Sequence, residues 1–302
     1  MRIPRTVAHY GAQDPRVATG GVETFARNLR VIFDEVLFLT PAARGEARIR
    51  RERIPVLCDN HWVRDWPEEI PVIGFQHGVA LDKFFVTRLR VDAGLAFRQW
   101  RAARRRNTLW VAAAPWVQQR FDGLHGNRAA HVIHHVVDHR HFDGKLENVG
   151  SRLVLHDARG RHKGRELIPA LAEAFPEWRF EGLDCEPEQV PDRMRRAAAF
   201  LHLSAYEGNS IVCNEAMAMD LPCLFTEVGL FCDDVGADVA TMPRRIAFGG
   251  RAGLIEAVGR FLGSLATRRF HPRAWSLEHA SVPANVDAWG RVLASFDESP
   301  WG

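Results

Sequence analysis

Short apolar runs alternate with helix-like stretches along almost the whole chain of 302 residues. This alternation is typical of parallel β-sheets, because two parallel strands are joined by a connection long enough to hold a helix. The first half contains six expected strands: Thr6–His9, Val36–Leu39, Pro55–Cys58, Val72–Phe75, Leu109–Ala113 and His131–His134. The sequence therefore predicts an α/β fold.

A second series of strands and helices follows a looser polar segment at residues 143–151. Its expected strands are Arg152–His156, Arg179–Glu181, Ala199–Leu203 and Pro222–Phe225, and its expected helices are Glu166–Ala174, Pro191–Ala197 and Ser210–Met219. Domains average about 150 residues, so we expect two domains, residues 1–145 and 146–284. A last expected helix, Asn285–Ser295, has no strand after it, and the terminal segment 285–302 could pack back on the first domain.

The first domain is basic: residues 1–145 hold 23 Lys and Arg against 15 Asp and Glu. A basic surface favours an anionic partner such as a membrane or a charged glycan. Nearly all of these cations are arginine, and a compositional bias is the favoured explanation of that skew. The stretch Arg98–Arg106, beside Phe97 and Trp100, predicts a basic amphipathic helix that could lie on an anionic membrane. A solvated helix face is the more common explanation of such a pattern. No nucleic-acid partner is expected.

No apolar run reaches the roughly 18 residues that cross a bilayer. The first residues lack the apolar core of a signal peptide, so a cytoplasmic location is expected, peripheral at the inner face of the membrane if the basic helix meets lipid. Five cysteines, at positions 58, 185, 213, 223 and 232, form no CxxC pair and predict reduced thiols. We expect no metal site, and we interpret Asp233-Asp234 as a surface turn.

The strongest local signal is a pair of glutamates, Glu207 and Glu215, that flank the start of an expected helix. Gly208, Asn209, Ser210 and Ile211 follow Glu207. The N-terminus of a helix offers free N–H groups to a diphosphate, and the two carboxylates would lie roughly 12 Å apart if the segment were helical throughout. At that distance one carboxylate could accept a hydrogen bond from a sugar hydroxyl while the other accepts from a ribose, with the diphosphate between them. Exposed glutamates on a capped helix are the alternative.

A basic loop follows the first strand of the second half and contains Arg159, Arg161 and Lys163. Arginine binds two phosphate oxygens through its planar fork, and lysine acts as a point charge, so the loop could neutralise a diphosphate. A solvated basic loop is the alternative.

Polar loops at the carboxyl ends of the first-half strands are further candidates, because ligands bind at that edge of a parallel sheet. The loop Asp59-Asn60-His61 follows the third strand, and the loop Gln76-His77-Gly78 follows the fourth. Gly20 and Gly21 lie between the first strand and a helix, where they could let the backbone approach a phosphate or sugar. A structural histidine and a plain turn are the alternatives.

Taken together, these segments resemble glycosyltransferase family 4, the retaining enzymes of the GT-B fold. The resemblance spans residues 20 to 230. It rests on the paired glutamates, on the continuation Ala216–Cys223, on Gly20–Glu23, on Arg159 with Lys163-Gly164, on His77, and on His131–Asp138 as a degenerate hinge.

The resemblance implies two Rossmann-like domains facing each other across a cleft that holds a UDP- or GDP-sugar. It implies a metal-independent, retaining hexosyl transfer to a glycan, a lipid-linked or a small-molecule acceptor, with no cofactor beyond the sugar donor. The implied catalytic residues are His77, Glu207, Arg159 and Lys163. The implied donor-binding residues are Gly20, Gly21, Arg161, Gly208, Asn209, Ser210, Ile211 and Glu215, with Asn60 and His61 as acceptor-side candidates.

Three features depart from the family pattern. His135-Val136 replaces the usual Asn-Gly of the hinge, and the first domain is short. Four residues instead of five separate Arg159 from Lys163, so either Arg159 or Arg161 could be the main diphosphate ligand. Two other functions stay open: a catalytically silent partner that binds a nucleotide sugar or glycan for another transferase, and a nucleotide-sugar epimerase of similar fold.

Overall fold

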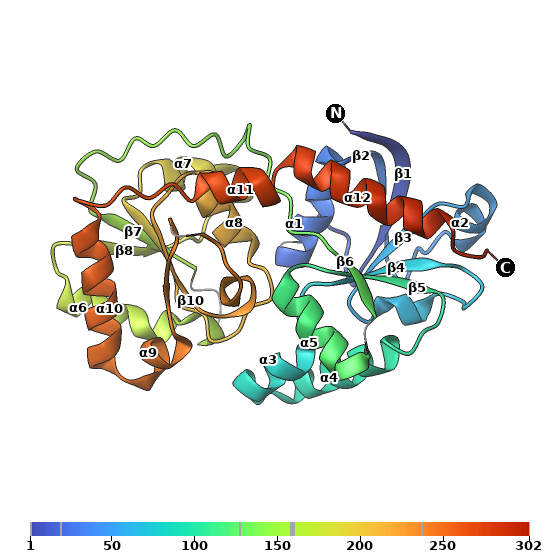
Figure 1. Cartoon of the computed structure of the whole chain (residues 1–302), viewed down its shortest axis with the longest axis horizontal. Coiled ribbons are helices and arrows are strands. Elements are labelled where there is room, and N and C mark those ends of the chain that lie inside the picture. Colours follow the sequence, from blue (N-terminus) through green and yellow to red (C-terminus); the bar gives the residue numbers. More distant parts are fainter. Residues whose placement is uncertain (1, 19, 127, 158–160, 237, 302) are drawn as a thin grey trace. The chain divides into compact units, whose positions relative to one another are not determined.

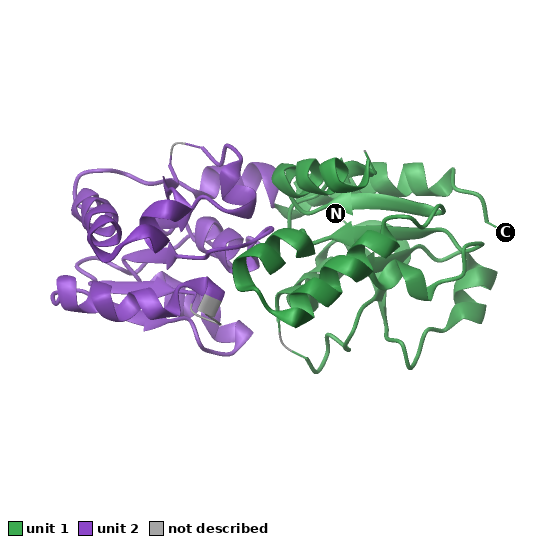
Figure 2. Ribbon diagram, turned by 90° about the horizontal axis from the view of Figure 1, so that it is seen from below, with its two compact units in different colours: residues 1–136, 281–302 green, residues 137–280 purple. Residues whose placement is uncertain are grey.

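The computed structural model describes residues 2–18, 20–126, 128–157, 161–236 and 238–301. The chain divides into two compact units, shown in separate colours in Figure 2. Unit 1 comprises residues 1–136 and 281–302, and unit 2 comprises residues 137–280. The sequence placed these limits at 145 and 284.

Unit 1 is built on a six-stranded parallel sheet (Figure 1). Its strands are β1 (Ile3–Tyr10), β2 (Phe33–Leu39), β3 (Val56–Asp59), β4 (Val72–Gln76), β5 (Thr108–Ala112) and β6 (Ala129–Val132). The strand order is β2-β1-β3-β4-β5-β6. Since β2 and β3 lie on opposite sides of β1, the chain reverses its direction across the sheet between β1 and β3. Such a switch point leaves a crevice at the carboxyl ends of the strands.

Helices surround this sheet: α1 (Gly21–Asn28), α2 (Glu46–Glu52), α3 (Ala80–Thr87), α4 (Arg90–Ala102), α5 (Pro115–His125) and α12 (Val282–Asp297), with 3-10 turns η1 (Leu29–Val31) and η2 (Trp62–Asp65). The C-terminal helix α12 packs on this unit through Trp289, whose ring lies 5.7 Å from that of Phe33 and 6.0 Å from that of Phe75. Asp297 at its end accepts two hydrogen bonds from Arg5.

Unit 2 contains a five-stranded parallel sheet in the order β11-β10-β9-β7-β8. Its strands are β7 (Leu153–His156), β8 (Arg179–Gly182), β9 (Ala199–His202), β10 (Cys223–Thr226) and β11 (Ala240–Met242). Here β8 and β9 flank β7, so the switch point lies between β7 and β9.

The helices of unit 2 are α6 (Ile168–Ala174), α7 (Val190–Arg195), α8 (Ile211–Ala218), α9 (Arg244–Gly249), α10 (Arg251–Ser264) and α11 (Arg273–His279), with 3-10 turns η3 (Arg161–Lys163), η4 (Arg165–Leu167), η5 (Pro187–Gln189) and η6 (Gly229–Cys232). An apolar core of strand and helix residues, among them Leu201, Leu224, Val258 and Phe261, lies between these layers.

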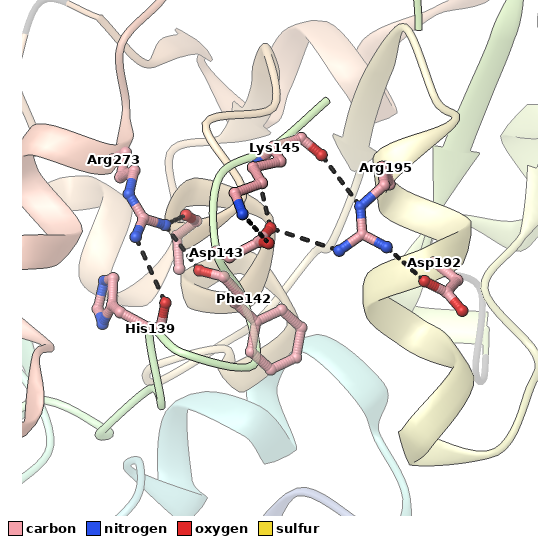
Figure 3. A network of polar contacts seen from close by, with 8 residues as sticks. His139, Phe142, Asp143, Lys145, Asp192, Arg195 and Arg273 are labelled. Atoms are coloured by element: carbon pink, nitrogen blue, oxygen red, sulfur yellow. Dashed lines mark hydrogen bonds and ion pairs between the residues drawn. The ribbon is translucent and has the colours of Figure 1, made fainter. Parts of the chain in front are cut away.

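The segment that enters unit 2 is held by two arginines (Figure 3). Arg273 of α11 donates to the carbonyl of Phe142 at 2.6 Å and also to that of Ala218. Arg195 of α7 donates to the carbonyl of Lys145 at 3.1 Å. At Gly144, φ is +76° and an added Cβ would lie 2.9 Å from Arg273 Cδ, so glycine suits both the conformation and the space. These contacts explain why residues 137–145 belong to unit 2, although the sequence predicts that the second domain begins at residue 146.

Candidate functional site

Four ionisable side chains meet at the switch point of unit 2. Asp157 directly follows β7, and His202 is the last residue of the neighbouring strand β9. Lys163, at the end of η3, lies 3.2 Å from the Asp157 carboxylate and donates a hydrogen bond to Glu207. The Nε2 atom of His202 lies 3.3 Å from Glu207. Sheet topology therefore brings together residues that are separated by up to 50 positions in the sequence.

The charges of this cluster stabilise each other. Burial alone would raise the pKa of Glu207, but attraction to Lys163 and the adjacent imidazole of His202 hold this pKa well below its usual range. Burial alone would lower the pKa of Lys163, but Glu207 and Asp157 raise it. The pKa of Asp157 is likewise lowered, because Lys163 and His202 outweigh the burial of the carboxyl. Lys163 is therefore cationic and both carboxylates are ionised at neutral pH.

Backbone packing fixes the position of Lys163. The loop before it is held to the end of β9, since Ala205 N and Ser204 Oγ both donate to the carbonyl of His162, at 2.7 and 3.2 Å. The next residue, Gly164, has φ +81°, and an added Cβ would lie within 2.8 Å of the Leu203 side chain. Glycine allows both the left-handed conformation and the close approach.

The Glu207 loop rests on η6. Leu230 N donates to the carbonyl of Gly208 at 2.7 Å. Gly229 has φ +58°, and an added Cβ there would lie 2.4 Å from the carbonyl oxygens of Glu207 and Gly208. No sequence pattern singles out Gly229, because this contact joins two loops that are separate in the chain.

The helix α8 begins next to this loop. Ser210 and Asn209 are buried, and Ile211 is the first helical residue. Asn214 Nδ2 donates to Asn209 Oδ1 at 2.8 Å, which links the first turn of the helix to the loop. Glu215 lies in the second turn and is half-buried. The donor-binding roles of Gly208 to Ile211 and Glu215 stay predictions.

The basic loop is described in part. Arg159 lies outside the described residues, and for Arg161 the described part is its backbone in η3. The choice between these two arginines as the main diphosphate ligand stays open, and Lys163 is the cation whose side chain the structure places in the cluster.

A second cluster lies at the switch point of unit 1. Asp59, the last residue of β3, is buried, and its Oδ1 lies 2.8 Å from Nε2 of His77, the residue after β4. His9, near the end of β1, places its own Nε2 3.1 Å from Oδ1 and 3.0 Å from Oδ2 of Asp59. Although burial alone would raise the pKa of Asp59, the two imidazoles hold it well below its usual range. Asp59 is thus an ionised buried carboxylate between two histidines.

Aromatic rings surround His77. Phe25 of α1 meets its ring edge-on at 4.9 Å, and Phe75 lies at the same distance. His135, in the degenerate hinge, stacks on His77 at 5.3 Å with an angle of 20° between the rings. These contacts limit rotation of the His77 ring.

The loop after β3 positions the backbone of His77. Asn60 has φ +45°, and its Oδ1 accepts a hydrogen bond from His77 N at 3.1 Å. His61 stacks on Trp62 at 4.8 Å; burial first, and then Arg98, lower its pKa. Asn60 therefore touches the His77 segment, and acceptor binding by Asn60 and His61 stays a prediction.

Gly20, which precedes α1, and Gly21, its first residue, adopt backbone conformations that do not require glycine. Gly20 has φ 164°, an extended conformation that any residue adopts. An added Cβ at Gly21 would meet no described atom within 4 Å. At Gly20, by contrast, an added Cβ would lie 2.4 Å from the Glu23 carboxylate. The predicted approach of a sugar or phosphate to this backbone stays a prediction.

Three residues of the two clusters had no role in the sequence-based prediction: His9, Asp157 and His202. Asp59 belonged to a predicted candidate loop, without an assigned role. All four lie in the last two residues of an apolar strand or directly after it. Such polar residues at strand ends were a usable signal, because the carboxyl ends of parallel strands form one edge.

Among the described residues, no group of three His, Cys, Asp or Glu side chains is arranged to hold a metal ion. A shallow hollow of about 610 Å³ lies in unit 1 between the loops that follow β1 and β2. Its polar lining residues are Gln13, Asp14 and Thr40.

Known structures share this architecture. Sucrose-phosphate synthase from Thermosynechococcus elongatus superimposes with a TM-score of 0.75 and 13% identity, over 97% of this chain and 99% of that chain. HepE from Anabaena in complex with UDP-glucose gives 0.66 and 16%, over 96% and 99%. The lipopolysaccharide outer core galactosyltransferase WaaB gives 0.64 and 11%, over 96% and 99%. No protein-family model and no curated protein sequence matches the chain.

At these identities the similarity defines the fold. It covers nearly the whole chain, and both units are parallel sheets with helices. The chain therefore has the GT-B fold of glycosyltransferases, and the fold class predicted from the sequence is confirmed.

Proposed function

We propose that this protein is a glycosyltransferase that moves a hexose from a nucleotide-diphosphate sugar to an acceptor hydroxyl. The observation that carries the proposal is the position of Lys163 beside Glu207 at the switch point of unit 2. Ligands of doubly wound sheets bind at this edge. HepE, which shares the fold, was solved with UDP-glucose bound.

The proposed chemistry assigns a role to each member of the cluster. Transfer forms a bond between the acceptor oxygen and the anomeric carbon and breaks the bond between that carbon and the diphosphate. Negative charge builds on the leaving diphosphate, which takes up the proton of the acceptor hydroxyl. A lysine held cationic by its neighbours stabilises this charge without proton transfer. Glu207 would accept hydrogen bonds from sugar hydroxyls, and Glu215 from the ribose. We further propose that transfer is retaining and needs no metal, as the resemblance to glycosyltransferase family 4 implies.

A thermal-shift screen with UDP, GDP, ADP and their glucose or mannose conjugates tests donor binding. A ligand that binds the folded state alone raises the Tm by mass action. We expect one nucleotide family to raise the Tm, and the sugar conjugate to raise it further. No shift with any of these ligands at millimolar concentration would contradict the proposal.

Two variants test the site. We expect Lys163→Ala to weaken binding of the selected nucleotide diphosphate by about 10-fold or more, since charge-assisted hydrogen bonds contribute about 1.5–3 kcal/mol. Glu207→Gln should weaken binding of the sugar conjugate more than binding of the bare nucleotide. Lys145→Ala and Glu256→Gln are matched controls, because the side chains of Lys145 and Glu256 are 82% and 68% exposed.

Product analysis separates the remaining functions. Transfer to an added acceptor supports the main proposal. Binding without transfer or donor hydrolysis over a broad acceptor panel favours a catalytically silent partner, for which the degenerate hinge with His135 is the motivating feature. A changed nucleotide sugar formed without any acceptor favours an epimerase.

We also propose that α4 touches an anionic membrane. At 100° per residue, Phe97, Trp100 and Arg101 fall within an arc of about 100° on α4, and Arg104 follows in the turn after the helix. Phe97 is 57% exposed and Trp100 is 43% exposed. The guanidinium of Arg104 lies 3.5 Å above the Trp100 ring, and that of Arg101 lies 5.9 Å from the Phe97 ring. Exposed aromatics beside cations suit the headgroup region of an anionic bilayer. Among the described residues, no helix is long and apolar enough to cross a membrane.

One arginine of the predicted basic face is not on the surface. Arg105 is buried, and its guanidinium donates to the carbonyls of Pro67 and Ile70, both at 2.6 Å. The sequence-based prediction grouped Arg105 with the exposed arginines, because nothing in a run of three consecutive arginines distinguishes a buried position from an exposed one. Arg105 is therefore a structural residue of unit 1.

Vesicle sedimentation tests the membrane proposal. Vesicles containing phosphatidylglycerol should bind the protein, vesicles of phosphatidylcholine alone should not, and added salt should weaken binding because it screens exposed charges. The double variant Arg101→Ala, Arg104→Ala should lose binding, whereas Arg50→Ala, Arg51→Ala on α2 should keep it. If neither added salt nor the double variant Arg101→Ala, Arg104→Ala reduces vesicle binding, the proposal is overturned.

A further inference from the structure

The buried carboxylate of Asp59 has two imidazole partners and a restricted choice of hydrogen-bonding roles. An ionised carboxylate accepts hydrogen bonds and donates none. The Nε2 atoms of His9 and His77 lie within 3.1 Å of it, so both must carry their proton on Nε2 to bond it. The cost of burying a charge is thus offset by two N–H donors.

The Asp59 carboxylate and the His9 ring are closely packed against the backbone of Gly11. A Cβ added to Gly11 would lie 2.7 Å from Asp59 Oδ2 and 3.2 Å from the His9 ring. The His9 ring is 2% exposed, and its Nδ1 has no hydrogen-bond partner among the described residues. His9 therefore uses one ring nitrogen, and that nitrogen points at Asp59.

His77 differs from His9 in exposure. Its side chain is 13% exposed, and its ring is clamped by Phe25, Phe75 and His135. With Nε2–H directed at Asp59, the lone pair of the neutral ring lies on Nδ1. A hydroxyl that meets His77 at Nδ1 would donate its proton in a hydrogen bond to this lone pair.

We propose that Asp59, supported by His9, is the positioning residue that holds His77 as the Nε2–H tautomer, with Nδ1 available to accept a hydrogen bond from a sugar or acceptor hydroxyl. The tautomer follows from unit 1 alone. Its use toward a hydroxyl rests on the proposed sugar transfer.

The tautomer is measured on the full chain without ligand. Long-range proton–nitrogen correlation spectra of histidine-labelled protein at about pH 8 distinguish protonated from bare ring nitrogens in neutral imidazoles. His77→Gln identifies the His77 signals by their loss. We expect a protonated Nε2 and a bare Nδ1 for His77 in the wild type, with the Nε2 proton protected from exchange with water.

Asp59→Ala should remove this protection and shift the His77 signals toward a mixture of tautomers. Asp65→Asn is the matched control, because Asp65 is another carboxylate of unit 1, which accepts a hydrogen bond from Tyr10 at 2.6 Å. It should leave the His77 signals unchanged. A bare Nε2 in the wild type would overturn the proposal, even if Asp59→Ala does not fold. Wild-type His77 signals in a folded Asp59→Ala variant would overturn it as well.

Turnover with UDP-glucose, or with the donor that the thermal screen selects, tests the functional half. Asp59→Ala should lower kcat by about 10-fold or more, because the His77 ring then loses the charge-assisted hydrogen bond that fixes its tautomer and orientation. Adding His77→Ala to this variant should cost little more, since the two residues act as a unit. Additive losses contradict positioning while leaving sugar transfer intact. Absence of turnover in the wild type, with the predicted tautomer present, contradicts the proposed function alone.

Discussion

The backbone of Gly229 lies against that of Glu207 so closely that a methyl group on Gly229 would approach the Glu207 carbonyl oxygen to 2.4 Å. The contact joins η6 to the loop that carries Glu207, and the hydrogen bond from Leu230 N to Gly208 O strengthens it. The position of Glu207, whose carboxylate lies beside Lys163, therefore depends on η6. This turn contributes no ionised side chain to the cluster.

This contact predicts that Gly229→Ala is destabilising for two reasons. The left-handed conformation at φ +58° costs a non-glycine residue about 1–2 kcal/mol, and the clash displaces the Glu207 loop. We expect a lower urea midpoint and weaker binding of the nucleotide sugar. Gly150→Ala is the control, because Gly150 has φ +73° but an added Cβ would meet no described atom within 4 Å. Equal loss of binding in both variants would show that the contact is unimportant.

The structural role of buried Arg105 can be tested by comparison with its exposed neighbour Arg106. Arg105→Ala leaves the carbonyls of Pro67 and Ile70 without their buried donor, so it should destabilise the protein by about 2–4 kcal/mol. The neighbouring Arg106 is exposed, and Arg106→Ala should change stability by less than about 0.5 kcal/mol. Urea unfolding followed by tryptophan fluorescence measures both. A similar small effect of the two variants would contradict the structural role of Arg105.

Trp289 tests the place of α12 in unit 1. Its side chain is 1% exposed and packs between Phe33 and Phe75, so Trp289→Ala should cost about 3–5 kcal/mol. Trp100→Ala, at a 43% exposed position, should cost far less. Hydrogen exchange adds a spatial readout, since loss of the α12 contact should raise exchange in β2 and β4. Unchanged exchange there would contradict this packing.

Much of the fold could be predicted because it depends on local patterns. Apolar runs bounded by polar residues marked ten strands of the two sheets, to within a few residues at their ends. The expected strand His131–His134 corresponds to β6 (Ala129–Val132), which begins and ends two residues earlier. This strand lies at the edge of the sheet, and polar residues in and around it weaken the apolar pattern that marks its ends. The short strand β11 (Ala240–Met242) has three residues, too few for periodicity to show.

The candidate site was predictable where residues close in sequence share a loop, as for Lys163 or for Glu207 and Ser210. It was not predictable where strand order decides which residues meet. His9, Asp59 and His77 are separated by up to 68 positions in the sequence, and they meet because β3 lies between β1 and β4. Asp157 and His202 meet for the same reason across β7 and β9. A single sequence contains no direct record of strand order.

The lowered pKa of Asp59 predicts a specific dependence of stability on acid. A carboxyl whose pKa is lower in the folded state stabilises the fold above its ordinary pKa of about 4, and this stabilisation is lost as pH falls through the lowered value. Below pH 4 the unfolded chain binds a proton that folded Asp59 does not bind. The free energy of unfolding should therefore fall by up to about 1.4 kcal/mol per pH unit for this one group.

Urea unfolding of the wild type and of Asp59→Asn at several values between about pH 3 and pH 6 measures this contribution. Asp59→Asn should be less stable at neutral pH, because the imidazoles of His9 and His77 lose a charged acceptor, and its stability should decline less steeply in acid. Asp34→Asn removes an exposed carboxylate of the same unit and should keep the wild-type slope. The two units can unfold in separate transitions, so hydrogen exchange in β1 and β3 is followed at the same pH values. An Asp59→Asn slope equal to that of the wild type would show that Asp59 is not the buried, ionised partner of His9 and His77.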